Sequence, residues 1–207
     1  MSSSNSLALP LQRLLATAAK SLPRETGVTA RAARKSGAGP GPTVIVADTS
    51  GSMADRAGAR SKIELLREAV AAAWERLHPS IRHLVRFDSA ALSLYSPAEL
   101  TEPSGVTAMH LGLQTAGNVQ PARVIVISDG QPDDEAAALK AADELGCRID
   151  VIYCGPDYDA KAIAFMQRLA RLGCGECVVE DVVRAAGGLR LTAAVQRLAL
   201  PAPKARP

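Results

Sequence analysis

The sequence predicts an α/β fold, built from a mainly parallel sheet with helices on both faces. Two short, continuous apolar runs, TVIVA at 43–47 and ARVIVIS at 122–128, are typical of strands covered on both sides. Between such runs lie longer stretches with apolar residues at i, i+3 and i+4 spacing, which indicate amphipathic helices. Strands that alternate with helices favour a doubly wound, Rossmann-like sheet, in which ligands bind at the carboxyl ends of the strands.

The first half of the predicted domain supplies a buried strand, a helix and a hairpin. Residues 43–48 form the strand, and residues 61–77 form the helix, with Ser61 as its N-cap. The segments 81–89 and 90–96 are two strands joined by a tight turn, so they predict one antiparallel edge strand. The remaining expected elements are a loop at 101–107, helices at 108–117, 133–146 and 159–173, strands at 122–128, 147–155 and 176–181, and a closing helix at 182–199 that Gly187-Gly188 weakens.

The chain is expected to divide into a basic N-terminal extension (1–42), one folded domain (43–200) and a disordered tail (201–207). The extension combines a short amphipathic helix with a Gly- and Pro-rich linker that ends in GAGPGP. It carries six Lys or Arg residues and one Glu, a net charge of +5, so that the remainder of this +3 chain carries −2. Such an arm suits contact with nucleic acid or an acidic partner, and a solvated extension is the alternative.

The composition argues against a membrane-spanning protein and against a nucleic-acid surface. No apolar run approaches the roughly 20 residues that cross a bilayer. The N-terminus has no positively charged segment before its apolar part, so no secretory signal is predicted and a cytoplasmic location is expected. Aromatic residues make up only 3% of the chain, which leaves few side chains for base stacking.

The four cysteines are expected to be free thiols, because a cytoplasmic protein lies in a reducing compartment. The segment CGEC at 174–177 has the C-x-x-C spacing of zinc ligands, but no second pair of Cys or His residues accompanies it. A buried thiol or a short turn is therefore favoured over a zinc site that would also recruit Cys147.

Two predicted strands end on carboxylates, at Asp48 and Asp129, and both acids belong to the carboxyl edge of the sheet. The first acid opens the motif D-T-S-G-S, which adds the hydroxyls of Ser50 and Ser52 to the same edge. Oxygen ligands of this kind suit a hard cation, with Mg²⁺ expected and Mn²⁺ or Ca²⁺ as alternatives. The two acids can hold metal-bound water from outside the ligand sphere.

A third hydroxyl is needed from another loop at the same edge. The segment SGVT offers Thr107, with Ser104 as the weaker candidate. The motifs together resemble a von Willebrand factor A (VWA) domain, which is similar to integrin I-domains. The metal-ion-dependent adhesion site (MIDAS) of that family is written D-x-S-x-S, then a distant Thr, then a distant Asp.

The match to the family spans about residues 43–200 and keeps the order of the motifs. DTSGSM, which begins at Asp48, matches the first part of the site. Thr107 with Gly112-Leu113 matches the second part, and Asp129 in SDGQP matches the third. Val106 is a departure, because the family often has a second glycine directly before the Thr.

The resemblance implies that Ser50, Ser52 and Thr107 ligate the metal, while Asp48 and Asp129 hold its water or bind it directly. Few charged ligands then touch the cation, which leaves it able to accept a Glu or Asp from a partner. The expected function is divalent-cation-dependent protein binding, as an adaptor or assembly factor. Small VWA proteins of this kind often act beside AAA+ ATPases, so such an ATPase or another complex subunit is the expected partner.

Further residues are candidates for contact with that partner. Arg56, Arg60 and Lys62 flank the first metal loop, and His110 follows Thr107 by three residues. The alternative function is a scaffold or a nucleic-acid- or complex-associated module that acts through the basic arm, with the metal structural or incidental.

An enzyme is not expected. No His, Lys or Cys is predicted beside the site to act as a base. Haloacid-dehalogenase-like phosphatases need a second acid two residues after the first, where this chain has Ser50, and no nucleotide-binding glycine motif follows the first strand. The structural alternatives are capping of the next helix by Asp48-x-Ser50, an N-cap at Thr107 and a plain turn at Asp129-Gly130.

Overall fold

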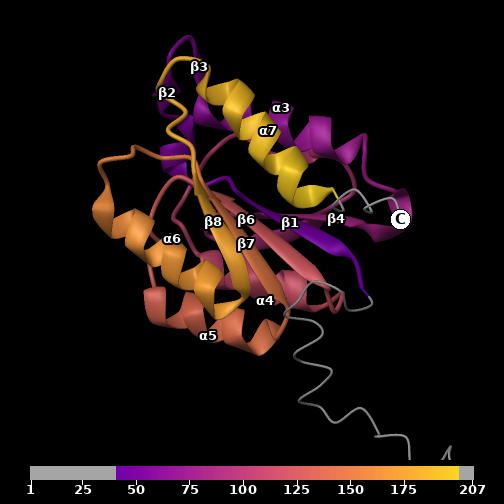
Figure 1. Cartoon of the computed structure of the whole chain (residues 1–207). Helices are drawn as coiled ribbons and strands as arrows, with labels where there is room; N and C mark the ends of the chain where they lie inside the picture. Colours follow the sequence, from indigo (N-terminus) through magenta and orange to yellow (C-terminus); the bar gives the residue numbers. More distant parts are fainter. Residues whose placement is uncertain (1–40, 201–207) are drawn as a thin grey trace, which may run out of the picture.

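A computed structural model of the chain describes residues 41–200, which form a six-stranded sheet with helices on both faces (Figure 1). All neighbouring strands of this sheet are parallel except the edge pair β5 and β4, which confirms the predicted fold class. The predictions for the extension before residue 41 and for the tail lie outside the described residues. In spatial order the strands are β5 (Ala91–Leu94), β4 (Arg82–Phe87), β1 (Thr43–Asp48), β6 (Arg123–Ser128), β7 (Arg148–Tyr153) and β8 (Cys174–Val179).

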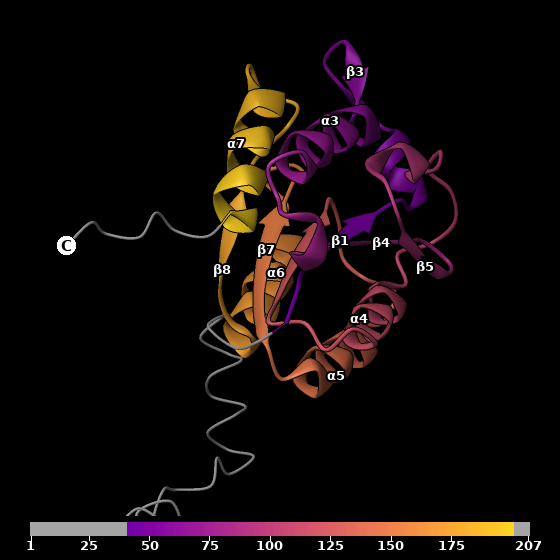
Figure 2. The ribbon, with the colours of Figure 1, turned by 90° about the vertical axis from the view of Figure 1, so that its right-hand side faces the viewer.

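Helices cover both faces of the sheet, as Figure 2 shows edge-on. One face carries α3 (Lys62–Trp74) and α7 (Gly187–Ala199), and the other carries α4 (Met109–Gly117), α5 (Glu135–Leu145) and α6 (Ala160–Leu172). Burial of both faces of β1 explains why its sequence is continuously apolar. Val44 and Val46 pack on the α4 side, whereas Ile45 and Ala47 pack on the α3 side, so neither face of the strand meets water.

The helix ends follow from local chemistry. Ser61 caps α3 in a capping box, in which its hydroxyl accepts from the Glu64 N–H and the Glu64 carboxylate accepts from the Ser61 N–H. Asp134 caps α5 by accepting from the Ala137 N–H at 2.8 Å. Gly146 ends α5 with a φ of 60°, a conformation that glycine adopts without strain.

Strand β1 lies at the centre of the sheet, between β4 and β6. The chain leaves β1 through α3 to reach β4 on one side, and β6 lies on the other side. The carboxyl ends of β1 and β6 are therefore a point where the strand order reverses, and in sheets of this kind such points form the ligand crevice. This is the edge at which Asp48 and Asp129 leave their strands.

The structure corrects several sequence-based element boundaries. Strand β8 begins at Cys174, so CGEC is part of a strand and is not a turn. Helix α7 begins at Gly187 and includes both glycines that were expected to weaken it. Several short elements were not predicted: the 3-10 helices η1 (Gly51–Ala54), η2 (Pro79–Ile81) and η3 (Pro97–Glu99), and the small hairpin of β2 (Arg56–Ala57) and β3 (Arg60–Ser61).

The four cysteines are free thiols, as predicted. Cys174 is exposed, whereas Cys177 is half-buried, and burial raises the pKa of Cys177 to about 11, which disfavours its thiolate form. Between residues 41 and 200, no helix is long and apolar enough to cross a membrane.

Candidate metal centre

Strand β1 delivers a fully buried carboxylate to the edge of the sheet. The Asp48 side chain accepts a hydrogen bond from the Ser50 N–H on Oδ1 at 2.8 Å and from the Ser128 hydroxyl on Oδ2 at 2.5 Å. Ser128 is the last residue of β6, so this bond joins the ends of the two strands. Asp48 therefore shapes the D-T-S-G-S loop from inside the sheet rather than from its surface.

Burial of the Asp48 side chain makes its negative charge costly. Burial raises the pKa of this carboxyl to about 6; hydrogen bonds from Ser128 and Ser50 oppose the rise, and the charge of Asp129 adds to it. The groups that hydrogen bond to Asp48 are neutral hydroxyl and amide donors. A positive charge nearby would favour the ionised form.

A row of oxygen groups runs from β1 to β6 across this edge. The hydroxyls of Ser50 and Ser52 lie 3.3 Å apart, and the Ser52 hydroxyl donates to Asp129 Oδ1 at 2.8 Å. Ser50 and Asp129 are buried, whereas Ser52 is exposed on η1. The structure thus brings four of the five predicted site residues together: Asp48, Ser50, Ser52 and Asp129.

Thr107 lies on a loop that is held against the D-T-S-G-S loop. The Ser104 N–H donates to the Thr49 carbonyl at 2.9 Å, and the Gly51 N–H donates to the Gly105 carbonyl at 3.2 Å. The Thr107 hydroxyl forms no hydrogen bond with the described residues. The structure therefore joins the two loops, and the role of the Thr107 hydroxyl stays a prediction.

Asp133 positions Thr107, a role that sequence reasoning missed. Its carboxylate accepts from the Thr107 N–H at 3.3 Å, and its own N–H donates to the Thr107 carbonyl at 3.2 Å. Asp133 and Asp134 lie next to each other before α5, and the structure gives the capping role to Asp134 alone. A helix needs only one N-cap residue, so the presence of two adjacent acids before α5 was a signal that one of them has another partner.

Lys62, which the sequence placed only on the flank of the first metal loop, lies directly beside Asp129. Only 6% of this residue is exposed, and its Nζ donates to Asp129 Oδ2 at 2.6 Å. The same ammonium lies 3.2 Å from the Asp55 carboxylate and 3.4 Å from the Ser52 carbonyl. Burial lowers the pKa of Lys62, but Asp129 and Asp55 together outweigh it and raise the pKa above its ordinary value, so Lys62 is charged and is no base.

The position of Lys62 in the helix held a signal that sequence reasoning passed over. Lys62 is the first residue of α3, where the helix dipole disfavours a cation. A lysine at such a position needs nearby carboxylates. Asp129, 67 residues away in the chain, supplies one of them.

The other predicted partner-contact residues lie apart from the row of oxygens. Arg56 and Arg60 are exposed on the β2–β3 hairpin, where Arg56 donates to the Ala59 carbonyl and Arg60 pairs with Glu68. Arg56 also borders a hollow of about 310 Å³ that Glu64, Arg67 and Glu102 line. His110 is half-buried on α4, and its Nδ1 has no partner among the described residues. Contact with a partner stays a prediction for all three.

The donor set fits a hard cation that depends on hydroxyl and water oxygens. Among residues 41–200 no group of three or more His, Cys, Asp or Glu side chains is placed to hold a metal ion. Ser50 and Ser52 instead present neutral oxygens 3.3 Å apart, next to Asp129 Oδ1. Neutral hydroxyls with one adjacent carboxylate suit Mg²⁺ or Mn²⁺ better than a soft metal.

Gly105 tests how the Thr107 loop is held. Its φ is +69°, and a side chain there would overlap the Ser89 hydroxyl, which accepts from the Val106 N–H at 3.2 Å. We expect Gly105→Ala to lower the free energy of unfolding by about 2 kcal/mol, because alanine is strained at this φ and breaks the Ser89 contact.

Urea unfolding measures that loss, and faster amide exchange at Val106 would accompany it. Gly130→Ala is the matched control, because a side chain at Gly130 meets no atom within 4 Å. Equal stability of Gly105→Ala and Gly130→Ala would contradict the expected strain.

At the level of sequence, no family model and no curated protein matches the chain. Solved structures do match it. An aerotolerance-related membrane protein from Bacteroides fragilis aligns with a TM-score of 0.56 and 15% identity, over 77% of this chain and 98% of its own. BatB, a conserved hypothetical protein from Bacteroides thetaiotaomicron, aligns with a TM-score of 0.55 and 17% identity, over 77% of this chain and 99% of its own. Manganese-loaded TRAP protein from Plasmodium vivax aligns with a TM-score of 0.52 and 18% identity, over 75% of this chain and 73% of its own. At these sequence identities the similarity shows the fold alone.

Proposed function

The chain has the fold of von Willebrand factor A domains, and we propose that it works as a divalent-cation-dependent protein-binding module. VWA domains are generally non-catalytic binding modules. The observation that carries the metal part of the proposal is the row of Ser50, Ser52 and Asp129 oxygens at the carboxyl edge of the sheet. A cation bound there would supply an open coordination position for a carboxylate oxygen of the partner protein.

Some residues of the site would bind the cation directly, and others would orient those ligands. Ser50 and Ser52 would provide direct ligands, with Thr107 as the third hydroxyl. Asp48 would orient Ser50 through the bond from the Ser50 N–H, and Asp129 would orient Ser52 by accepting from its hydroxyl. Since the direct ligands are neutral, a cation at this site would keep its affinity for an acidic group.

Mg²⁺ is the cation that we propose, with Mn²⁺ and Ca²⁺ as alternatives. The hydroxyl donors support a hard cation, and a protein of the same fold, the Plasmodium vivax TRAP protein, was solved in a manganese-loaded form. The partner would bring a Glu or Asp side chain, and an AAA+ ATPase or another subunit of a cytoplasmic complex is the class we propose. Val106, half-exposed on the Thr107 loop, offers an apolar contact beside such a carboxylate.

Calorimetric titration of Mg²⁺ and Mn²⁺ tests the site itself. We expect the double variant Ser50→Ala, Ser52→Ala to bind each cation at least tenfold more weakly than the wild type, which corresponds to about 1.4 kcal/mol or more. Ser93→Ala is the matched control, because Ser93 is exposed on edge strand β5. Equal affinity of wild type and double variant, or no binding by either, would contradict the metal site.

A pull-down with and without EDTA tests docking. Partners that depend on the site should be lost in EDTA and also lost with the Ser50→Ala, Ser52→Ala variant. Retention that is equal in EDTA but falls steeply with salt would instead favour the basic N-terminal arm as the binding element.

A further inference from the structure

The Lys62 ammonium occupies one side of the candidate metal centre. Its three acceptors are Asp129 Oδ2 at 2.6 Å, Asp55 Oδ2 at 3.2 Å and the Ser52 carbonyl at 3.4 Å, which matches the three donors of an ammonium. Both oxygens of Asp129 are thereby in use, since Oδ1 accepts from Ser52. The side chain of Asp129 thus faces a hydroxyl on one side and a cation on the other.

The two carboxylates around Lys62 differ in their surroundings. The Asp129 side chain is only 2% exposed, whereas the Asp55 side chain is 66% exposed. The backbone of Lys62 is anchored by a hydrogen bond from its N–H to the Asp55 carbonyl at 3.0 Å. A lysine side chain has several rotatable bonds, so the ammonium can leave Asp129 and stay on Asp55 without moving the helix.

Charge repulsion gives a reason for such a movement. A divalent cation held by Ser50 and Ser52 would lie next to Asp129, and the ammonium lies on the other oxygen of the same carboxylate. A divalent cation and an ammonium on opposite sides of one carboxylate repel each other strongly in a partly buried site. Asp55 offers the ammonium a carboxylate that is further towards solvent.

We propose that Lys62 is a tethered counter-cation of this site, which weakens divalent cation binding and which, when a cation binds, leaves Asp129 and keeps its contact with Asp55. In the metal-free protein Lys62 neutralises Asp129 and keeps the edge of the sheet intact. Occupancy of the site is then coupled to the position of a side chain at the start of α3, beside the β2–β3 hairpin. The inference rests on the proposed function, because it concerns the same site.

Charge removal at Lys62 is the first test. We expect Lys62→Met, in a calorimetric titration with Mg²⁺, to bind at least tenfold more tightly than the wild type, and Lys62→Arg, which keeps the charge, to bind no more tightly than the wild type. In EDTA the Lys62→Met variant should melt at a lower temperature than the wild type, because Asp129 loses its counterion. Addition of Mg²⁺ should raise the melting temperature of the variant by more than it raises that of the wild type. Lys140→Met is the control, since Lys140 is exposed on α5.

The second test uses the wild-type protein alone. Acylation of wild-type lysines, followed by mass spectrometry, reports how accessible each ammonium is. We expect Mg²⁺ to increase the labelling of Lys62 at least threefold over EDTA and to leave that of Lys140 unchanged. Unchanged labelling of Lys62 at a Mg²⁺ concentration that saturates the protein would overturn the proposed movement.

The outcomes separate this inference from the proposed function. If wild type and Lys62→Met bind Mg²⁺ equally, Lys62 is only a structural ion pair and the proposed function stands. If Lys62→Met binds and the wild type does not, the counter-cation role is supported and cation-dependent docking by the wild type is contradicted. If neither protein binds Mg²⁺ or Mn²⁺, both the site and the role of Lys62 are overturned.

Discussion

Asp150→Asn is expected to lower the free energy of unfolding by about 3 kcal/mol at pH 7, because it breaks a buried ion cluster. The Asp150 side chain is fully buried in β7 and pairs with Arg123 at 2.6 Å and with Arg148 at 2.8 Å. It also accepts from the Glu176 N–H at 2.9 Å, which fastens β8 to β7. The two arginines are partly exposed, so water solvates their charges when the Asp150 carboxylate is removed. We therefore expect a loss of stability at the lower end of the range for broken buried ion pairs.

The effect of this substitution should depend on pH with a defined sign. Burial alone would raise the pKa of Asp150, but Arg148, the Glu176 N–H and Arg123 outweigh burial and hold the pKa below its ordinary value. A lowered pKa stabilises the fold above the pKa of the unfolded chain, near 3.9, and this stabilisation is lost as the pH falls through the folded pKa. The difference between wild type and variant should therefore be full at pH 7 and should shrink below about pH 4.

Urea unfolding at pH 7 and at pH 3 measures both quantities. Glu102→Gln is the control, since Glu102 is an exposed carboxylate paired with Arg67, and its loss should cost less than about 1 kcal/mol. A loss for Asp150→Asn that is no larger than that for Glu102→Gln would contradict the structural role of the cluster. A loss that is independent of pH would contradict its electrostatic origin.

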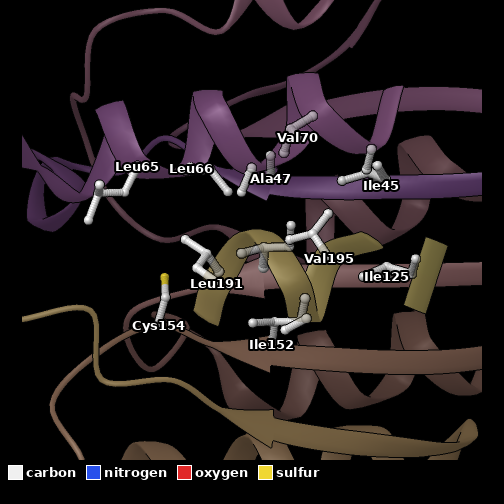
Figure 3. Close-up of a cluster of buried hydrophobic side chains, with 14 of the residues drawn as sticks. Ile45, Ala47, Leu65, Leu66, Val70, Ile125, Ile152, Cys154, Leu191 and Val195 are labelled. Atoms are coloured by element: carbon white, nitrogen blue, oxygen red, sulfur yellow. The ribbon is translucent and has the colours of Figure 1, made fainter. Parts of the chain in front are cut away.

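Leu66→Ala is expected to lower the free energy of unfolding by about 3 to 5 kcal/mol. Leu66 is fully buried on α3, in the cluster between α3, α7 and the sheet that Figure 3 shows with Ala47 and Leu191. Truncation removes buried apolar contacts and leaves a cavity, which two helices and a central strand can close only in part. Thermal or urea unfolding measures the loss.

The same variant separates stability from the candidate site. Leu66 belongs to the apolar cluster between α3, α7 and the sheet, so its truncation should leave the Mg²⁺ affinity of the folded protein within about twofold, or roughly 0.4 kcal/mol. Leu92→Ala, at a half-exposed leucine of β5, is the matched control and should change stability by less than about 0.5 kcal/mol. A loss below about 1 kcal/mol for Leu66→Ala would contradict the packing that the structure gives it.

Much of the fold follows from patterns that are local in the chain. The apolar run of β1 and the periodicity of α3 each specify one element, because strand and helix place side chains with different repeats. The matched strand ends put Asp48 and Asp129 at one edge, since parallel strands share their carboxyl edge. That inference needed only the order of the elements, and the structure bears out the proximity of these acids to Ser50 and Ser52.

Boundaries that depend on packing were not readable from the chain. Helix α7 begins at two glycines, and packing explains why these residues are small: a side chain at Gly188 would lie 2.8 Å from Leu65, and one at Gly187 would lie 2.6 Å from the Val182 backbone. Strand β8 takes in CGEC because its backbone pairs with β7, although Cys174 has a positive φ of 56°. In both places tertiary contact outweighs the local preference of the residues.

The sequence by itself determined the α/β fold and the set of oxygen-bearing residues at one sheet edge, because both follow from periodicity and from where strands end. Only the tertiary structure decided which charges meet at that edge. It placed the Lys62 ammonium on Asp129 and the Asp133 carboxylate on the Thr107 backbone, contacts between residues 67 and 26 positions apart in the chain. Such pairs depend on how α3, β6 and their loops pack, and a local sequence pattern does not specify contacts between residues so far apart in the chain.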